Sequence, residues 1–109
     1  MDLKNRVALR VKTIRKLRGL SQEALAALVS RSPDAISNLE RAISLPAIDT
    51  LEALAVGLGV PIAELISETA AETGKRVGLM ARLTDTARRL DDGALLAAVE
   101  IVEVLAKTR

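Results

Sequence analysis

The sequence contains no cysteine, histidine, phenylalanine, tyrosine or tryptophan. Without Cys and His, zinc fingers, iron–sulfur clusters, His-ligated haem and thiol chemistry are excluded, and so is catalysis by a nucleophile–histidine pair. Without aromatic rings the chain lacks the stacking platforms that hold single-stranded nucleic acid or RNA. A phosphate-binding glycine loop is also missing. We therefore expect no metal, no cofactor and no enzymatic activity.

Long hydrophobic runs are missing as well. No unbroken apolar run is longer than that of Ala94 to Val99, which is far shorter than a membrane span. The first six residues carry charge and lack the apolar segment of a signal peptide. With no cysteine to form a disulfide, the sequence is compatible with a reducing compartment. These features predict a soluble cytoplasmic protein.

The charge of the chain is small in sum and uneven in distribution. The 109 residues carry 16 Lys and Arg against 14 Asp and Glu, a net charge of +2. Residues 1–45 hold nine basic and four acidic residues, whereas residues 46–109 hold seven basic and ten acidic ones. The first part is thus +5 and the second −3, which favours an anionic partner for the first part.

Apolar residues recur at three- and four-residue steps almost throughout, which predicts an all-α protein. We expect helices over residues 2–18, 21–29, 32–41, 48–58 and 60–66, with Gly19, Gly59 and Pro46 as breaks. The predicted core is Val7, Val11, Ile14, Leu17, Leu20, Leu25, Leu28, Ile36, Leu39, Leu51, Leu54, Ala55, Leu58, Leu65 and Ile66. Residues 68–74 (ETAAETG) are small and polar and are typical of a linker. Two further helices follow, over about 76–90 and 93–107.

The most informative segment is SQEALAALVSRSPDAISNLE, residues 21–40. It consists of two short predicted helices joined by a tight turn, which is the outline of a helix-turn-helix. With Pro46, the LxxLA of residues 51–55 and the LGVPxxxL of residues 58–65, the chain resembles the phage-repressor and Cro-type (xenobiotic-response-element) family over about residues 8–67. The resemblance implies a five-helix lambda-repressor-like DNA-binding domain over residues 1–67, followed by the linker and a C-terminal helical region over residues 75–109.

The resemblance also implies roles for individual residues. Residues 32–41 would form the recognition helix in the major groove. Its base-contacting positions are Pro33, Asp34, Ser37 and Asn38. Asn38 could pair bidentately with adenine, and Asp34 could accept from cytosine or cap its own helix. The implied phosphate contacts are Gln22, Lys16, Arg18, Arg31 and Arg41, although each arginine or lysine could equally belong to a solvated face. Arg15 and Glu40 match an ion pair that ties the first helix to the recognition helix.

The sequence departs from the family pattern around two turns. Ser30 and Ala42 stand where the family usually has glycine, and Arg31 stands where it has an apolar residue. Pro33, at the first position of the recognition helix, has no side-chain donor. These differences bear on the contacts that Pro33 and Arg31 can make and leave the predicted fold intact, because Ser and Ala tolerate such turns.

The last predicted helix is apolar around most of its circumference, with Glu100, Glu103 and Lys107 on one narrow stripe. Such a helix must be buried, and its simplest partner is a second copy of the chain. The predicted dimer interface is Val77, Met80, Leu83, Leu95, Leu96, Val99, Ile101, Val102 and Leu105. Packing onto the chain's own helices, a different protein partner and a small effector remain open alternatives.

The sequence therefore predicts a transcriptional regulator, a repressor, that binds a palindromic double-stranded DNA operator as a homodimer. The alternative is an antitoxin-like or scaffold protein whose C-terminal helices grip another protein. The operator, the genes it controls and any small-molecule effector do not follow from the sequence.

Overall fold

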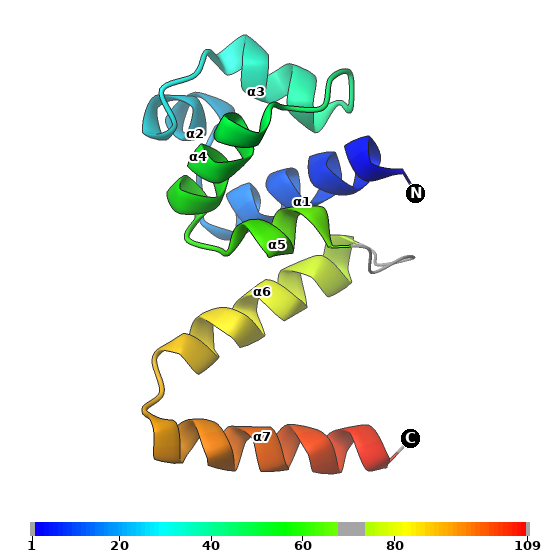
Figure 1. Cartoon of the computed structure of the whole chain (residues 1–109), viewed down its shortest axis with the longest axis vertical. Coiled ribbons are helices and arrows are strands. Elements are labelled where there is room, and N and C mark those ends of the chain that lie inside the picture. The colour runs from blue at the N-terminus through cyan, green and yellow to red at the C-terminus, as the bar shows by residue number, and fades with distance from the viewer. Residues whose placement is uncertain (1, 68–73, 109) are drawn as a thin grey trace. The chain divides into compact units, whose positions relative to one another are not determined.

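The computed structural model describes residues 2–67 and 74–108, and every regular element within those ranges is an α-helix. The all-helical prediction is confirmed. The helices are α1 (Leu3–Leu17), α2 (Gln22–Leu28), α3 (Pro33–Glu40), α4 (Ile48–Leu58), α5 (Ile62–Ile66), α6 (Gly74–Arg88) and α7 (Asp92–Lys107) (Figure 1). Residues 68–73 of the predicted linker lie outside the described residues, and Gly74 already begins α6.

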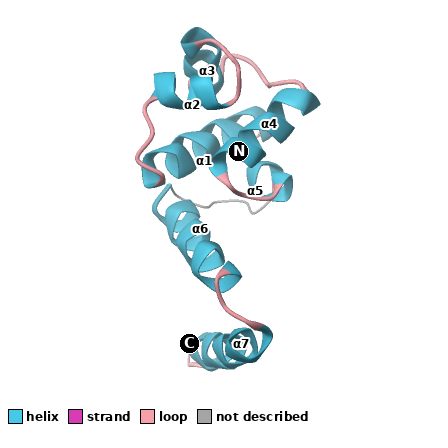
Figure 2. Ribbon diagram, turned by 90° about the vertical axis from the view of Figure 1, so that its left-hand side faces the viewer, coloured by secondary structure: helices cyan, strands magenta, loops and turns pink. Residues whose placement is uncertain are grey.

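The chain divides into two compact units, residues 1–78 and residues 79–109. In the first unit, α1 packs against α3, α4 and α5, and α2 packs against α3. Figure 2 shows α2 and α3 together at one end of this unit, above α1, α4 and α5. The two short helices of the predicted helix-turn-helix are thus carried on a support of three others.

The core of the first unit is aliphatic because the sequence has no aromatic residues to place there. Its largest fully buried side chains come from all five helices: Val7, Val11, Ile14, Leu25, Ile36, Leu54, Leu58 and Leu65. The predicted core is wrong at Leu17, Leu28 and Ile66, which are 37%, 57% and 39% exposed. Each lies in the last turn of its helix.

Side-chain caps fix where the helices begin. The hydroxyls of Ser21 and Ser32 accept hydrogen bonds from the backbone N–H groups of Ala24 and Ala35, at 3.0 Å and 3.1 Å. Each bond satisfies one of the N–H groups that a helix leaves unpaired at its start. Pro33 follows Ser32 as the first residue of α3, where its missing N–H has no consequence. The cap of Ser32 and the restricted backbone of Pro33 therefore both favour a helix that begins at Pro33.

Left-handed residues end four of the helices. Gly19 and Gly59 have φ values of +72° and +70°, as expected for the residue after a helix. Ser30 and Ala42 take the same conformation, with φ values of +56° and +58°, without the freedom of glycine. Behind Ala42, the N–H of Ile43 donates to the carbonyl of Asn38 at 3.0 Å, and the same motif recurs behind Ser30. The two turns that flank α3 are therefore strained by their Cβ atoms.

The second unit holds most of α6 and all of α7. Helix α7 contains no buried residue, and its apolar side chains are well exposed, from 38% at Leu95 to 63% at Ile101. Met80 and Leu83 in α6 are 40% and 49% exposed. Val77, also predicted for the interface, differs from these residues because it is only 4% exposed and lies in the first unit; its interface role stays a prediction.

Replacing the strained residue by glycine, as Ser30→Gly or Ala42→Gly, is expected to raise the free energy of unfolding by about 1 kcal/mol each. The gain comes from removing the Cβ clash of a left-handed residue. Thermal unfolding followed by circular dichroism would measure it as a melting temperature raised by about 4 °C or more. Ala27→Gly within α2 is the matched control and should lower stability instead. A lower melting temperature in both turn variants would contradict the strain.

Candidate nucleic-acid interface

A turn of four residues, 29–32, joins α2 to α3. Helices α2 and α3 pack closely, and their buried residues Leu25, Ala26, Ile36 and Leu39 form the contact with the core. The opposite side of α3 carries Asp34, Ser37, Asn38 and Arg41, which lie at three- and four-residue steps and so share one face. The helix pair thus presents one polar face while its other face is fixed to the core.

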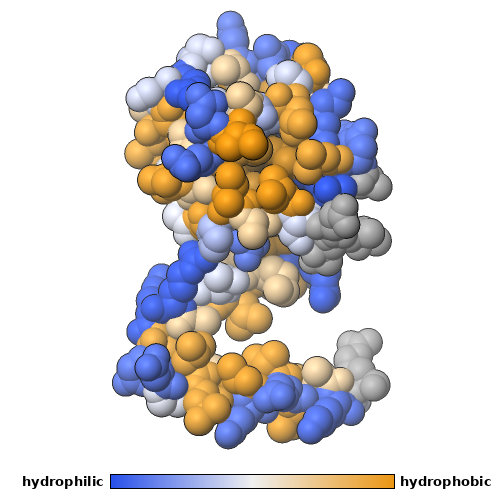
Figure 3. Space-filling model, viewed as in Figure 1, coloured by the Kyte–Doolittle hydropathy of each residue, from blue (hydrophilic) through white to orange (hydrophobic). Residues whose placement is uncertain are grey.

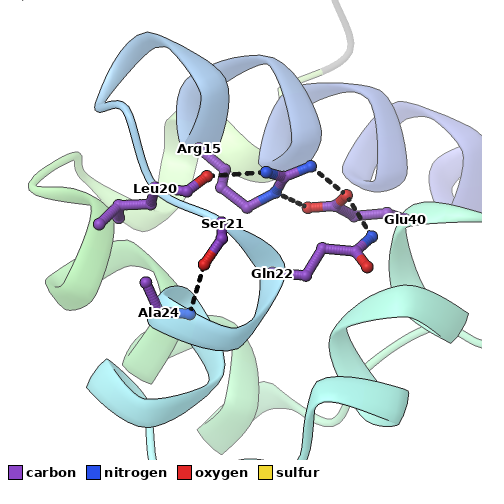
Figure 4. A network of polar contacts seen from close by, with 6 residues as sticks. All are labelled: Arg15, Leu20, Ser21, Gln22, Ala24 and Glu40. Carbon is purple, nitrogen blue, oxygen red and sulfur yellow. Dashed lines mark hydrogen bonds and ion pairs between the residues drawn. The ribbon is translucent and has the colours of Figure 1, made fainter.

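A part-buried ion pair holds α3 against α1 (Figure 4). Arg15 donates from Nε to Glu40 Oε2 at 2.6 Å and from Nη2 to Glu40 Oε1 at 2.9 Å. Its third bond, from Nη1, goes to the carbonyl of Leu20 at 2.8 Å. The two side chains are 9% and 2% exposed. A bidentate pair with this burial fixes both distance and angle between the two helices.

Gln22 adds α2 to the same network. Its Nε2 donates to Glu40 Oε1 at 3.1 Å, so the carboxylate of α3 binds side chains from both α1 and α2 (Figure 4). The amide nitrogen carries two hydrogens. Gln22 can therefore keep its bond to Glu40 and still offer the second N–H to a phosphate at the start of α2, which leaves its predicted phosphate contact open.

The hydrogen bond from Arg15 to Glu40 raises the pKa of the Arg15 guanidinium, against the smaller opposing effect of burial. A raised pKa means that the cation contributes its stability fully below the unfolded pKa and loses it only as the pH rises through the folded one. Because the pKa of an unperturbed arginine already lies far above neutral pH, this loss lies in strongly alkaline solution. Arg15 therefore stays cationic at neutral pH.

The predicted base-contacting residues differ in exposure. Pro33 and Asp34 are exposed at the start of α3, and Ser37 and Asn38 are half-buried in its second turn. Asn38 is already engaged, because its Oδ1 accepts a hydrogen bond from Nη2 of Arg41 at 2.9 Å. The structure thus brings a predicted base contact and a predicted phosphate contact together as one pair, which the sequence reading did not foresee.

Two other predicted phosphate contacts are bound to protein groups. Arg31 donates from Nε and Nη2 to Thr50 Oγ1, at 3.2 Å and 3.1 Å, and from Nη1 to the carbonyl of Val29 at 3.1 Å. It thereby joins the end of α2 to the start of α4. Arg18 donates from Nε to the carbonyl of Leu58 at 2.8 Å, at the end of α4. Lys16, by contrast, is exposed. The phosphate contacts of Arg18 and Arg31 stay predictions. In each case the guanidinium would have to bind a phosphate while keeping these bonds to the protein.

Sequence reasoning missed the tie between Arg31 and Thr50. The available signal was a basic residue at a turn position where the resembling family has an apolar one. It also missed that the core holds Arg10, which is 3% exposed. Among the described residues, no group of His, Cys, Asp and Glu side chains could hold a metal ion. Within the same residues, each helix is too short or too polar to cross a membrane.

Comparison with known proteins agrees with this geometry. The family model described as helix-turn-helix matches residues 11–65, just over half of the 109 residues. Searches of curated proteins and of solved structures gave no significant match. The matched span begins within α1 and ends in α5, so it includes the ion pair, the turn and the polar face of α3.

Replacing Arg15 by alanine is expected to lower the free energy of unfolding by about 3 kcal/mol, because the Glu40 carboxylate would stay buried without its cation. Affinity for DNA per folded molecule should fall much less, because Arg15 holds α3 without lying on its polar face. Chemical denaturation, and DNA titrations corrected for the folded fraction, measure the two effects. Lys16→Ala removes an exposed neighbouring cation and should change stability by less than about 0.5 kcal/mol. Equal stability of wild type and Arg15→Ala would contradict the structural role of the ion pair.

Proposed function

The chain belongs to the helix-turn-helix family of DNA-binding transcriptional regulators, and on that premise we propose that it is a sequence-specific repressor that binds a palindromic operator. In this proposal α3 enters the major groove of double-stranded DNA, and two copies of the chain bind the two halves of the site. The observation that carries the proposal is the polar face of α3, held against α1 and α2 by the network around Glu40.

The polar face of α3 suits a groove better than a small-molecule site. Its outward residues Asp34, Ser37, Asn38 and Arg41 supply both donors and acceptors, which is the chemistry that distinguishes base edges. An α-helix with its side chains is about 10–12 Å across, so α3 fits within the width of the major groove, which is about 12 Å. The N-terminal backbone of α2, with Gln22 beside it, would then lie against the phosphates.

Electrostatics supports the same orientation. Residues 1–45, which include α1, α2 and α3, carry a net charge of +5, whereas the remaining residues carry −3. Lys16 and Arg41 are exposed and would neutralise phosphates. Each phosphate neutralised releases condensed cations from the duplex, so affinity should depend steeply on salt.

The second unit supports self-association. In α7, seven large apolar side chains between Leu95 and Leu105 are at least 38% exposed. Figure 3 shows hydrophobic atoms running along α7 beside a row of charged ones. So much exposed apolar surface on one helix marks an interaction site. A second copy presents the same surface, and a two-fold pair would set two α3 helices against half-sites one helical turn apart.

Selection of bound sites from a random duplex pool is expected to yield a two-fold symmetric consensus. Affinity for a selected site should fall about 10-fold or more between 50 mM and 200 mM salt, with a smaller affinity for random duplex. A chain that selects no consensus, binds duplex weakly and co-purifies with a second protein would instead support the antitoxin-like or scaffold alternative.

Val102→Asp is expected to break the dimer, because it places a charge in the exposed apolar stripe of α7. Sedimentation equilibrium should give about twice the 11.6 kDa chain mass for the wild type and the chain mass for the variant. Glu103→Gln, one residue along on the polar stripe, is the control and should leave the mass unchanged. A wild-type protein that sediments as a single chain would contradict the homodimer.

A further inference from the structure

Arg41 and Asn38 form a hydrogen-bonded pair on the face of α3 that the proposed function places in the major groove. Nη2 of Arg41 lies 2.9 Å from Oδ1 of Asn38. The two residues are three positions apart, so their side chains leave the helix on the same side. Asp34 and Ser37 share this face, but Asn38 and Arg41 lie at its C-terminal end, where the helix stops.

The end of α3 fixes the position of Arg41. Its backbone N–H donates to the carbonyl of Ser37 at 3.0 Å, and the left-handed turn at Ala42 returns the N–H of Ile43 to the carbonyl of Asn38. The backbone of Asn38 and that of Arg41 are therefore parts of one closed turn. The guanidinium starts from a defined point beside Asn38 rather than from a flexible segment.

This bond orients the amide of Asn38. A guanidinium has only N–H donors, so the amide atom that faces Arg41 is the oxygen. The amide nitrogen then points away from Arg41 along the face of α3. Seen from the DNA, the pair offers the N–H groups of Nδ2 and the remaining N–H groups of Arg41, while one of the two lone pairs of the only acceptor, Asn38 Oδ1, already accepts from Arg41.

Such an arrangement changes which base Asn38 would select. Adenine offers N7 as an acceptor and its N6 amino group as a donor, so bidentate pairing needs the oxygen of Asn38 as well as its nitrogen. In this chain the adenine amino group would have to share that oxygen with Arg41 and would approach a cation. Guanine offers two acceptors, N7 and O6, which fit an array of donors.

We propose that Arg41 is a positioning residue for base recognition, which acts through its bond to Asn38 Oδ1 and turns an adenine-type reader into one that prefers guanine. The inference rests on the proposed function, because it assumes that this face of α3 lies in the major groove. Arg41 thereby sets sequence preference in addition to any phosphate contact that it makes.

The test compares the full-length wild type with Arg41→Ala and Asn38→Ala. Sites are selected from a random duplex pool, and Kd values are then measured on paired duplexes that differ by G·C against A·T at the guanine position of each half-site. We expect the wild type to prefer guanine by about 10-fold, in line with one good bidentate base contact. Arg41→Ala should lose or invert this preference, because the freed oxygen of Asn38 can then pair with adenine. Asn38→Ala should lose it without inversion.

Two controls keep the result interpretable. Circular dichroism establishes that each variant folds, and Lys16→Ala removes an exposed cation elsewhere, so it should weaken both duplexes equally. The double variant, Arg41→Ala with Asn38→Ala, should distinguish the two duplexes to the same extent as Asn38→Ala alone, because the two residues act as one unit. If Arg41→Ala weakens both duplexes equally and keeps the wild-type consensus, the positioning role is overturned while the proposed function stands. A wild type that selects no consensus would overturn both.

Discussion

The carboxylate of Glu40 is the point on which the geometry of the helix-turn-helix depends. It accepts from Arg15 of α1 and from Gln22 of α2, so one side chain of α3 fixes the orientation of three helices. Apolar packing alone is non-directional, and an aliphatic core without aromatic rings provides few shape constraints beyond volume. A bidentate ion pair supplies direction. The polar face of α3 is therefore oriented by an interaction that lies outside that face.

Much of the first unit could be predicted because its signals are local. Ser21 and Ser32 indicate where helices begin, Gly19 and Gly59 indicate where they end, and the spacing of the aliphatic residues predicts the buried faces. The failures have a common cause. Whether Leu28 is covered, or whether Arg31 meets Thr50, depends on how far a neighbouring helix extends, which local periodicity does not contain. Val77 is buried although an exposed position was expected, and its helix belongs partly to the first unit.

The two turns that flank α3 adopt a backbone conformation that their residue types disfavour. Ser30 and Ala42 take left-handed conformations that glycine would adopt without strain. They do so because both turns are closed by paired backbone hydrogen bonds, and because α3 packs against both α2 and α1. The packed helices on either side over-determine the turn, so a Cβ atom is tolerated at a price of about 1 kcal/mol each.

Helix α3 divides its eight residues between two tasks by their position around the axis. Ile36 and Leu39 are buried, Glu40 is bound from behind, and Asn38 with Arg41 remains on the free side. On this short helix the outward side chains of Asn38 and Arg41 lie within hydrogen-bond distance of each other. The donors and acceptors that either one can offer therefore depend on the other. The acceptor that Asn38 offers on this face is therefore shared with Arg41 and is not set by Asn38 alone.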